Sequence, residues 1–146
     1  MKKILLISYY WPPNAGVGAR RWLNFQKYLS KEFAITVYTP ENPSMLNEDN
    51  SLLNQVSSGT QVIKQKIWEP YDLYKIFTKK RKVNPGVLID STDGFKDKLT
   101  NWVRSNFFIP DAKCFWIEHS VSFLSKLFSK ENYDFVISTG PPHSMH

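Results

Sequence analysis

The hydrophobic pattern of the first forty residues changes period twice, which constrains the fold more than any other feature of the chain. The apolar run Ile4–Ile7 is typical of a strand buried on both faces. Apolar residues then recur three and four positions apart at Trp22, Phe25 and Leu29, which is the spacing of one helix face. The β-branched and aromatic residues 33–40, "FAITVYTP", predict a second strand. Strand, helix and strand in this order predict a right-handed βαβ unit.

The rest of the chain contains further strand and helix patterns. Residues 60–68 and 133–140 predict two more strands, whereas residues 45–56 are polar and fit either a loop or a short helix. Helical spacing predicts two more helices, with apolar positions at Phe95, Leu99 and Trp102 and at Ile117, Val121, Leu124 and Phe128. We therefore predict an α/β fold, with a Rossmann-like, open, mostly parallel sheet and helices on both faces.

The composition excludes several classes of protein. With 42% hydrophobic and 15% aromatic residues, the chain is expected to pack into a domain rather than remain disordered. No apolar run approaches the roughly 18 residues that a membrane span needs, and the short run near the N-terminus lacks a signal-peptide cleavage site. The single cysteine, Cys114, cannot form an internal disulfide and fits a reducing compartment. We therefore expect a cytoplasmic protein.

The formal net charge of +6 raises the question of an anionic partner. The densest basic cluster, "KKRK" at residues 79–82, fits either a solvated loop or a surface that attracts phosphates of a nucleotide or a lipid. The chain contains neither zinc-ligand spacing nor an RNA-recognition motif, so no nucleic-acid partner is expected.

The loop "YYWPPNAGVGARRW", residues 9–22, follows the first predicted strand. Gly16 and Gly18 precede a helix, where open backbone amides attract anions, and Arg20 and Arg21 add positive charge for gripping a phosphate. Arg21 occupies the third position of G-x-G-x-x-G, and no G-K-[ST] occurs, so neither a dinucleotide fingerprint nor a Walker A loop is present. The alternative is that the glycines only fit a tight loop.

The segment "TGPPHSMH" follows the last predicted strand. Thr139 and Ser144 could cap a helix, and His143 would face the same sheet edge as Gly16, because both loops leave carboxyl ends of strands. A structural role for His143 remains the alternative. No metal site is expected from His143 and His146 alone.

A third segment, residues 104–116, is rich in aromatic residues that fit either the core or a rim that stacks against sugars. Arg104 and Asp111 in this segment could form an ion pair. The chain has no nucleophile elbow, no Cys-x-x-Cys and no obvious glycosidase pair of carboxylates. The spacing of residues along the sequence therefore identifies no catalytic residue.

Three segments together resemble the N-terminal domain of GT-B glycosyltransferases of the family 4 type, which are bacterial enzymes of surface-polysaccharide assembly. They are the strand entering "YYWPPNAGVGARRW", the later "IPDAKCFW" and the strand ending in "VISTGPPHSMH". The resemblance is strong over residues 4–29, 109–117 and 134–146. It implies that residues 1–146 form one Rossmann-like, acceptor-side domain, and that the C-terminal donor-binding domain is absent from this chain.

The resemblance also implies a function. The whole enzyme would transfer a sugar from a nucleotide-sugar donor to a sugar or lipid-linked acceptor with retention of configuration, using neither metal nor cofactor. Gly16 and Gly18 would lie against the donor diphosphate or sugar, and Arg20 or Arg21 would neutralise the leaving group. The cleft would also be lined by Thr139, Gly140, His143 and Ser144. The isolated domain would be inactive, and a lipid-linked acceptor would bring the enzyme into peripheral contact with the inner face of the membrane.

Two other interpretations of the sequence remain open. One is a non-catalytic α/β module that binds anions or nucleotides through the same loop. The other is a different nucleotide-sugar enzyme of similar shape, such as an epimerase.

Overall fold

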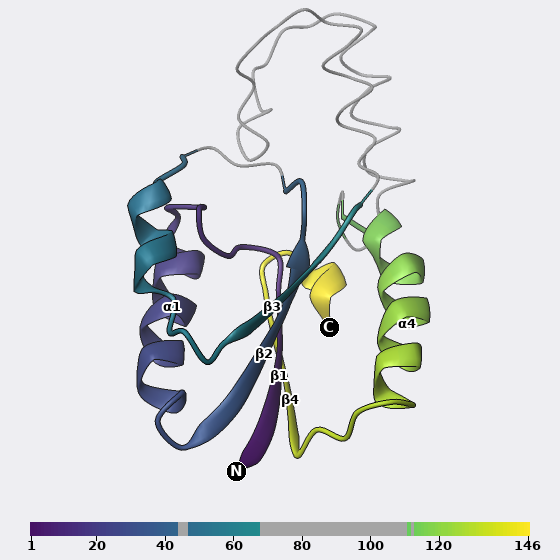
Figure 1. Cartoon of the computed structure of the whole chain (residues 1–146). Helices are drawn as coiled ribbons and strands as arrows, with labels where there is room; N and C mark the ends of the chain where they lie inside the picture. Colours follow the sequence, from purple (N-terminus) through teal and green to yellow (C-terminus); the bar gives the residue numbers. More distant parts are fainter. Residues whose placement is uncertain (44–46, 68–110, 112) are drawn as a thin grey trace, which may run out of the picture.

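The computed structural model describes residues 1–43, 47–67, 111 and 113–146, and contains a four-stranded, all-parallel sheet of order β3-β2-β1-β4. The elements in chain order are β1 (Lys2–Ser8), α1 (Val17–Leu29), β2 (Phe33–Pro40), the 3-10 helix η1 (Asn50–Gln55), β3 (Gln61–Gln65), α4 (Phe115–Phe128), β4 (Phe135–Thr139) and the 3-10 helix η2 (His143–Met145). In Figure 1 the sheet lies between α1 and α4, which cover opposite faces. The prediction of a parallel α/β sheet with helices on both faces is therefore confirmed.

Strand β1 lies inside the sheet, paired with β2 on one side and β4 on the other. Its side chains alternate between the two faces, as a strand requires. Leu5 is fully buried in a cluster with Tyr38 and Trp116 on the α4 side. Leu6 is buried with Ile35 on the α1 side. The continuous apolar run of β1 therefore serves two separate cores.

The strand order reverses at β1. The chain adds β2 and β3 on one side of β1 and then returns to place β4 on the other side. In open α/β sheets, a crevice forms outside the carboxyl ends of the two strands that meet at such a reversal. The carboxyl ends of β1 and β4 are therefore where a ligand site is expected.

The first predicted helix is present, but its buried face differs from the prediction. Trp22 and Leu29 are partly buried against the core, whereas Phe25 is half exposed. The fully buried positions of α1 are Ala19, Leu23 and Gln26. Gln26 is held there because its side-chain amide donates to the Thr60 hydroxyl at 2.6 Å. The prediction of a face through Phe25 was thus partly wrong, because a satisfied glutamine takes an inward position.

The helix after residue 114 is also present, and its buried face is shifted by one residue. The predicted positions Ile117, Val121 and Phe128 are 36%, 58% and 41% exposed. The face that packs on the sheet instead contains Trp116, Ser120, Phe123, Leu124 and Leu127. Only Leu124 of the predicted stripe belongs to it.

Two contacts of Tyr38 explain this shift. The Trp116 indole stacks on the Tyr38 ring with centroids 5.4 Å apart, and the Tyr38 hydroxyl donates to the Ser120 hydroxyl at 3.0 Å. A large indole and a hydrogen-bonding serine therefore set which side of α4 faces inward.

The remaining predictions have mixed outcomes. Part of the polar segment 45–56 forms η1, which begins after Asp49, and β3 ends at Gln65 rather than at residue 68. The helix predicted around residues 95–102, the basic cluster at 79–82 and Arg104 lie outside the described residues.

Replacing Trp116 tests the inward face of α4. Trp116→Ala should lower the free energy of unfolding by about 3–5 kcal/mol, because it removes the largest fully buried side chain and leaves a cavity against Tyr38. Ile117→Ala is the control and should cost less than about 1 kcal/mol, since Ile117 is at the surface. Urea unfolding measures both, and equal losses would contradict the observed face.

Candidate functional site

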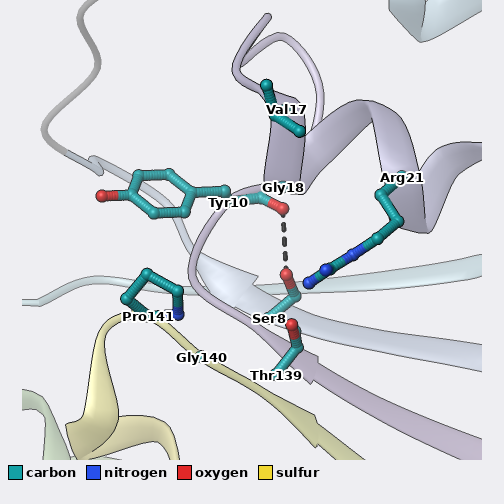
Figure 2. A pocket seen from close by; sticks show the side chains of 8 residues that line it. All are labelled: Ser8, Tyr10, Val17, Gly18, Arg21, Thr139, Gly140 and Pro141. Carbon is teal, nitrogen blue, oxygen red and sulfur yellow. Dashed lines mark hydrogen bonds between the residues drawn. The ribbon is translucent and has the colours of Figure 1, made fainter.

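A cleft of about 270 Å³ opens where β1 and β4 end (Figure 2). We call it the β1–β4 cleft. It is lined by Ser8, Tyr10, Val17, Gly18, Arg21, Thr139, Gly140 and Pro141. The lining thus combines the end of β1, the start of α1 and the turn after β4. The expectation that the loops after the first and last strands share one sheet edge is confirmed.

Two hydrogen bonds hold the walls of the cleft in place. The Trp22 indole N–H donates to the Thr139 hydroxyl at 2.7 Å and ties α1 to β4. The Ser8 hydroxyl donates to the Tyr10 carbonyl at 2.9 Å, drawn as a dashed line in Figure 2, and turns the chain away from β1. Together with the pairing of Ser8 in β1 with Thr139 in β4, these bonds link the three segments that form the cleft.

The loop before α1 explains why glycine stands at position 16. The buried Asn14 side chain accepts a hydrogen bond from the Gly16 N–H at 2.8 Å. A Cβ on Gly16 would lie 2.9 Å from the same Asn14 oxygen, too close for any other residue without a shift. Gly16 is also the N-cap residue, so no side chain caps α1.

The start of α1 therefore remains a donor of backbone hydrogen bonds. The first N–H groups of a helix have no partners within the helix and carry a partial positive charge. The first turn of α1 contains no acidic residue that would compensate this charge. Because Val17 and Gly18 line the β1–β4 cleft, this positive helix end lies at the cleft wall.

The two neighbouring arginines have different positions. In Figure 2 the Arg21 side chain extends toward Ser8 and Thr139, and within the described parts of the chain it forms no ion pair. Arg20 points elsewhere, because its guanidinium lies 3.6 Å from the Asp49 carboxylate and donates to the Ala15 carbonyl at 3.1 Å. Of these two arginines, Arg21 is the one available to a ligand in the cleft.

Asp49 is well suited to hold Arg20. Hydrogen bonds from the Ser51 hydroxyl and the Ser51 N–H, together with the charge of Arg20, lower the pKa of Asp49. The Asp49 N–H in turn donates to the Pro13 carbonyl at 2.8 Å, which binds this segment to the loop before α1. Arg20 thus belongs to the support of the loop.

The turn after β4 continues into η2, where Asp111 anchors it. The Asp111 carboxylate accepts hydrogen bonds from the Ser144 N–H and the Ser144 hydroxyl, both at 2.9 Å, and from the Lys113 N–H at 2.8 Å. Burial acts to raise the pKa of Asp111, but these bonds and one from the His143 N–H outweigh burial and lower it. Asp111 therefore pins the chain just beyond Gly140 and Pro141 to the start of α4.

Four of the eight residues predicted for the site line the cleft, namely Gly18, Arg21, Thr139 and Gly140. The other four do not: Gly16 lies before the helix, Arg20 pairs with Asp49, His143 is exposed, and Ser144 binds Asp111. The predicted pair of Asp111 with Arg104 stays a prediction, because Arg104 lies outside the described residues; among those described, Asp111 accepts hydrogen bonds from Ser144 and Lys113.

Sequence reasoning missed four lining residues and the anchor Asp111. Tyr10, Val17 and Pro141 were inside the loops that had been singled out, and Ser8 directly precedes the first of them, so their proximity to the cleft could have been anticipated. The bond between Asp111 and Ser144 joins residues 33 positions apart, and no local pattern signals it.

A second hollow, of about 180 Å³, lies at the ends of β2 and β3. Its charged lining residues are Glu41, Glu48 and Lys64. The two carboxylates make it unsuitable for an anion, whereas the charged side chain of the β1–β4 cleft is an arginine. An anionic ligand would therefore favour the β1–β4 cleft.

Among residues 1–43, 47–67, 111 and 113–146, no group of three or more His, Cys, Asp or Glu side chains is placed to hold a metal ion. In the same part of the chain, none of the helices has the length and apolar character required to cross a bilayer.

Comparison with models of protein families gave no match, and searches of curated proteins and of solved structures also found no significant match. The function of the cleft must therefore be argued from its own geometry.

The Asp111 anchor predicts a stability effect that depends on pH. Because its pKa is lowered in the folded state, Asp111 stabilises the fold above the ordinary aspartate pKa of about 3.9, and this contribution disappears as the pH falls through the lowered value. Asp111→Asn should lower the midpoint of thermal unfolding at neutral pH by a few degrees. The difference from the wild-type chain should vanish in acid.

Ser144→Ala is the matched control for this experiment. It removes one of the bonds to Asp111 but leaves the Ser144 N–H in place, so a smaller loss is expected. A difference for Asp111→Asn that persists unchanged below the aspartate pKa would contradict the anchor.

Proposed function

We propose that this chain is the acceptor-side domain of a retaining glycosyltransferase that uses a nucleotide-sugar donor, and that the β1–β4 cleft receives the phosphates of that donor. The enzyme would act in the assembly of a bacterial surface polysaccharide. One observation carries the proposal: the start of α1, the Arg21 guanidinium and the turn "TGPP" meet in one cleft at the reversal of strand order. The resemblance of these segments to family 4 glycosyltransferases supports the same interpretation.

The chemistry of sugar transfer explains why such a cleft would be useful. Breaking the bond between the sugar and a nucleoside diphosphate leaves negative charge on the phosphate oxygens. Backbone N–H groups at a helix start and a guanidinium, both already in place, stabilise this charge as it develops. In this proposal Arg21 and the first turn of α1 supply the positive charge, and a second α/β domain binds the rest of the donor.

A second candidate function is a non-catalytic module that binds anions. The residues that line the cleft include no Asp, Glu, His or Cys, so the described part of the chain offers no general base or charged nucleophile there. This composition favours binding over catalysis by this chain alone. A transferase would prefer a nucleotide sugar to small anions, whereas a simple module would bind phosphate or sulfate equally well.

The two arginines provide a matched test of the cleft. Arg21→Ala should weaken the binding of uridine diphosphate or of a uridine diphosphate sugar by about tenfold, which corresponds to the loss of one charged hydrogen-bonding group. Arg20→Ala should leave binding within about twofold, because Arg20 pairs with Asp49 outside the cleft. Calorimetry or NMR titration measures both affinities.

Inorganic phosphate serves as the competing ligand in the same titrations. Equal effects of the two substitutions would contradict the assignment of Arg21 to the cleft. Equal affinity for phosphate and for the nucleotide sugar would support the anion-binding module. For the transferase, the full-length protein supplied with nucleotide sugars and a lipid-diphosphate acceptor should transfer sugar, and Arg21→Ala should slow that transfer.

A further inference from the structure

Ser8 and Thr139 place two hydroxyl groups next to each other on the floor of the β1–β4 cleft. The two residues are register partners in the parallel pair of β1 and β4, so their side chains lie on the same face of the sheet. Ser8 is 2% exposed and Thr139 is 9% exposed, and both line the cleft. In Figure 2 the Arg21 side chain extends toward both hydroxyls. A ligand that reaches the floor therefore meets two hydroxyls and one guanidinium.

The hydrogen bond that each hydroxyl already forms fixes its remaining capacity. An indole N–H only donates, so the Thr139 oxygen is the acceptor in its 2.7 Å bond with Trp22. A carbonyl oxygen only accepts, so the Ser8 hydroxyl gives its proton to Tyr10 at 2.9 Å. Thr139 thus keeps a proton to donate, and Ser8 keeps lone pairs to accept with. Among the residues that the structure describes, neither group has another hydrogen-bond partner.

These two open positions specify the chemistry of a ligand. Buried polar groups normally form their hydrogen bonds, because a group left without a partner costs free energy. A phosphate oxygen accepts, so it matches the Thr139 proton and the Arg21 guanidinium. A fully ionised phosphate has no proton to give to Ser8, whereas a hydroxyl group beside the phosphate has one.

We propose that the floor of the β1–β4 cleft recognises a phosphate ester that carries a hydroxyl group beside its phosphate, as a sugar phosphate does. Thr139 donates to a phosphate oxygen, and Ser8 accepts from the ligand hydroxyl. Trp22 is a positioning residue, because its indole N–H occupies the Thr139 oxygen and leaves the Thr139 proton for the ligand. The phosphate part of this ligand rests on the proposed function, whereas the neighbouring hydroxyl is required by Ser8.

Calorimetric titration with two phosphate esters tests the role of Thr139. Glucose 1-phosphate has hydroxyl groups beside its phosphate, and methyl phosphate has none. Thr139→Val should weaken the binding of both ligands by about tenfold, because it removes a hydrogen bond to a charged group. Thr139→Ser restores a hydroxyl and should bind both within about threefold of the wild-type chain. The matched control is Thr36→Val, which removes a buried strand hydroxyl outside the cleft and should change binding by less than about twofold.

The role of Ser8 has a different signature in the same titrations. Ser8→Ala should weaken the binding of glucose 1-phosphate by about fivefold, because the ligand hydroxyl loses its acceptor. Binding of methyl phosphate should stay within about twofold, since this ligand has no hydroxyl to donate. Equal losses for the two ligands would overturn the assignment of Ser8, because a distorted cleft alone would then explain them.

A double-mutant cycle tests whether Trp22 acts through Thr139. Trp22→Phe keeps an aromatic ring against the core but removes the indole N–H, so it should weaken the binding of both ligands by about threefold. In a chain that already carries Thr139→Val, the same substitution should have no further effect. Equal losses in the two backgrounds would overturn the positioning role.

Failure of this proposal is distinguishable from failure of the proposed function. If neither ester binds, or if Arg21→Ala leaves their binding unchanged, the proposed function fails and this proposal fails with it. If both esters bind through Arg21 while Thr139→Val and Ser8→Ala have no effect, the hydroxyl pair is overturned and the anion-binding cleft stands.

Discussion

The structure depends on the burial of β1 between two parallel neighbours. Each fully buried leucine stabilises the fold by about 2 kcal/mol, and β1 places Leu5 and Leu6 in separate cores on opposite faces of the sheet. A strand with both faces and both edges covered cannot shift its register without exposing these side chains. The place where β1 ends is therefore held firmly, and this end forms the floor of the β1–β4 cleft.

The start of α1 at the cleft is less stable than it could be, because its N-cap residue Gly16 has no side chain to cap the helix. With glycine as the N-cap residue, this cost is only about a few tenths of a kcal/mol relative to serine, threonine or asparagine. The Asn14 side chain binds the N–H of the N-cap residue Gly16, so no side chain caps the first turn of α1, which begins at the cleft. Residues that are not the most stabilising choice for their local structure are common at functional sites. Here the backbone N–H groups of the first turn of α1, which no side chain caps, can donate hydrogen bonds to a ligand.

Part of the site could be predicted from residue types and topology. Gly18, Arg21, Thr139 and Gly140 follow strands whose carboxyl ends share an edge, and they line the cleft together. Arg20 could not be separated from Arg21 by sequence, because consecutive helical residues point in directions about 100° apart and either could face a ligand. Their roles diverge only because Asp49 holds Arg20 to the loop. The anchoring of Ser144 by Asp111 was beyond prediction, since the two residues are far apart in the chain.

The sequence by itself determined the order and type of the described elements, because the switch from an apolar run to helical spacing and back is a local property. It also determined that two glycine- and proline-containing loops would share one edge, since parallel strands all end on the same side. Only the tertiary structure decided which sides of α1 and α4 face inward. Both helices carry more large apolar residues than one face can bury, so contacts with the sheet had to select among them. Trp116 was selected by stacking on Tyr38, and Phe25 and Ile117 were left at the surface.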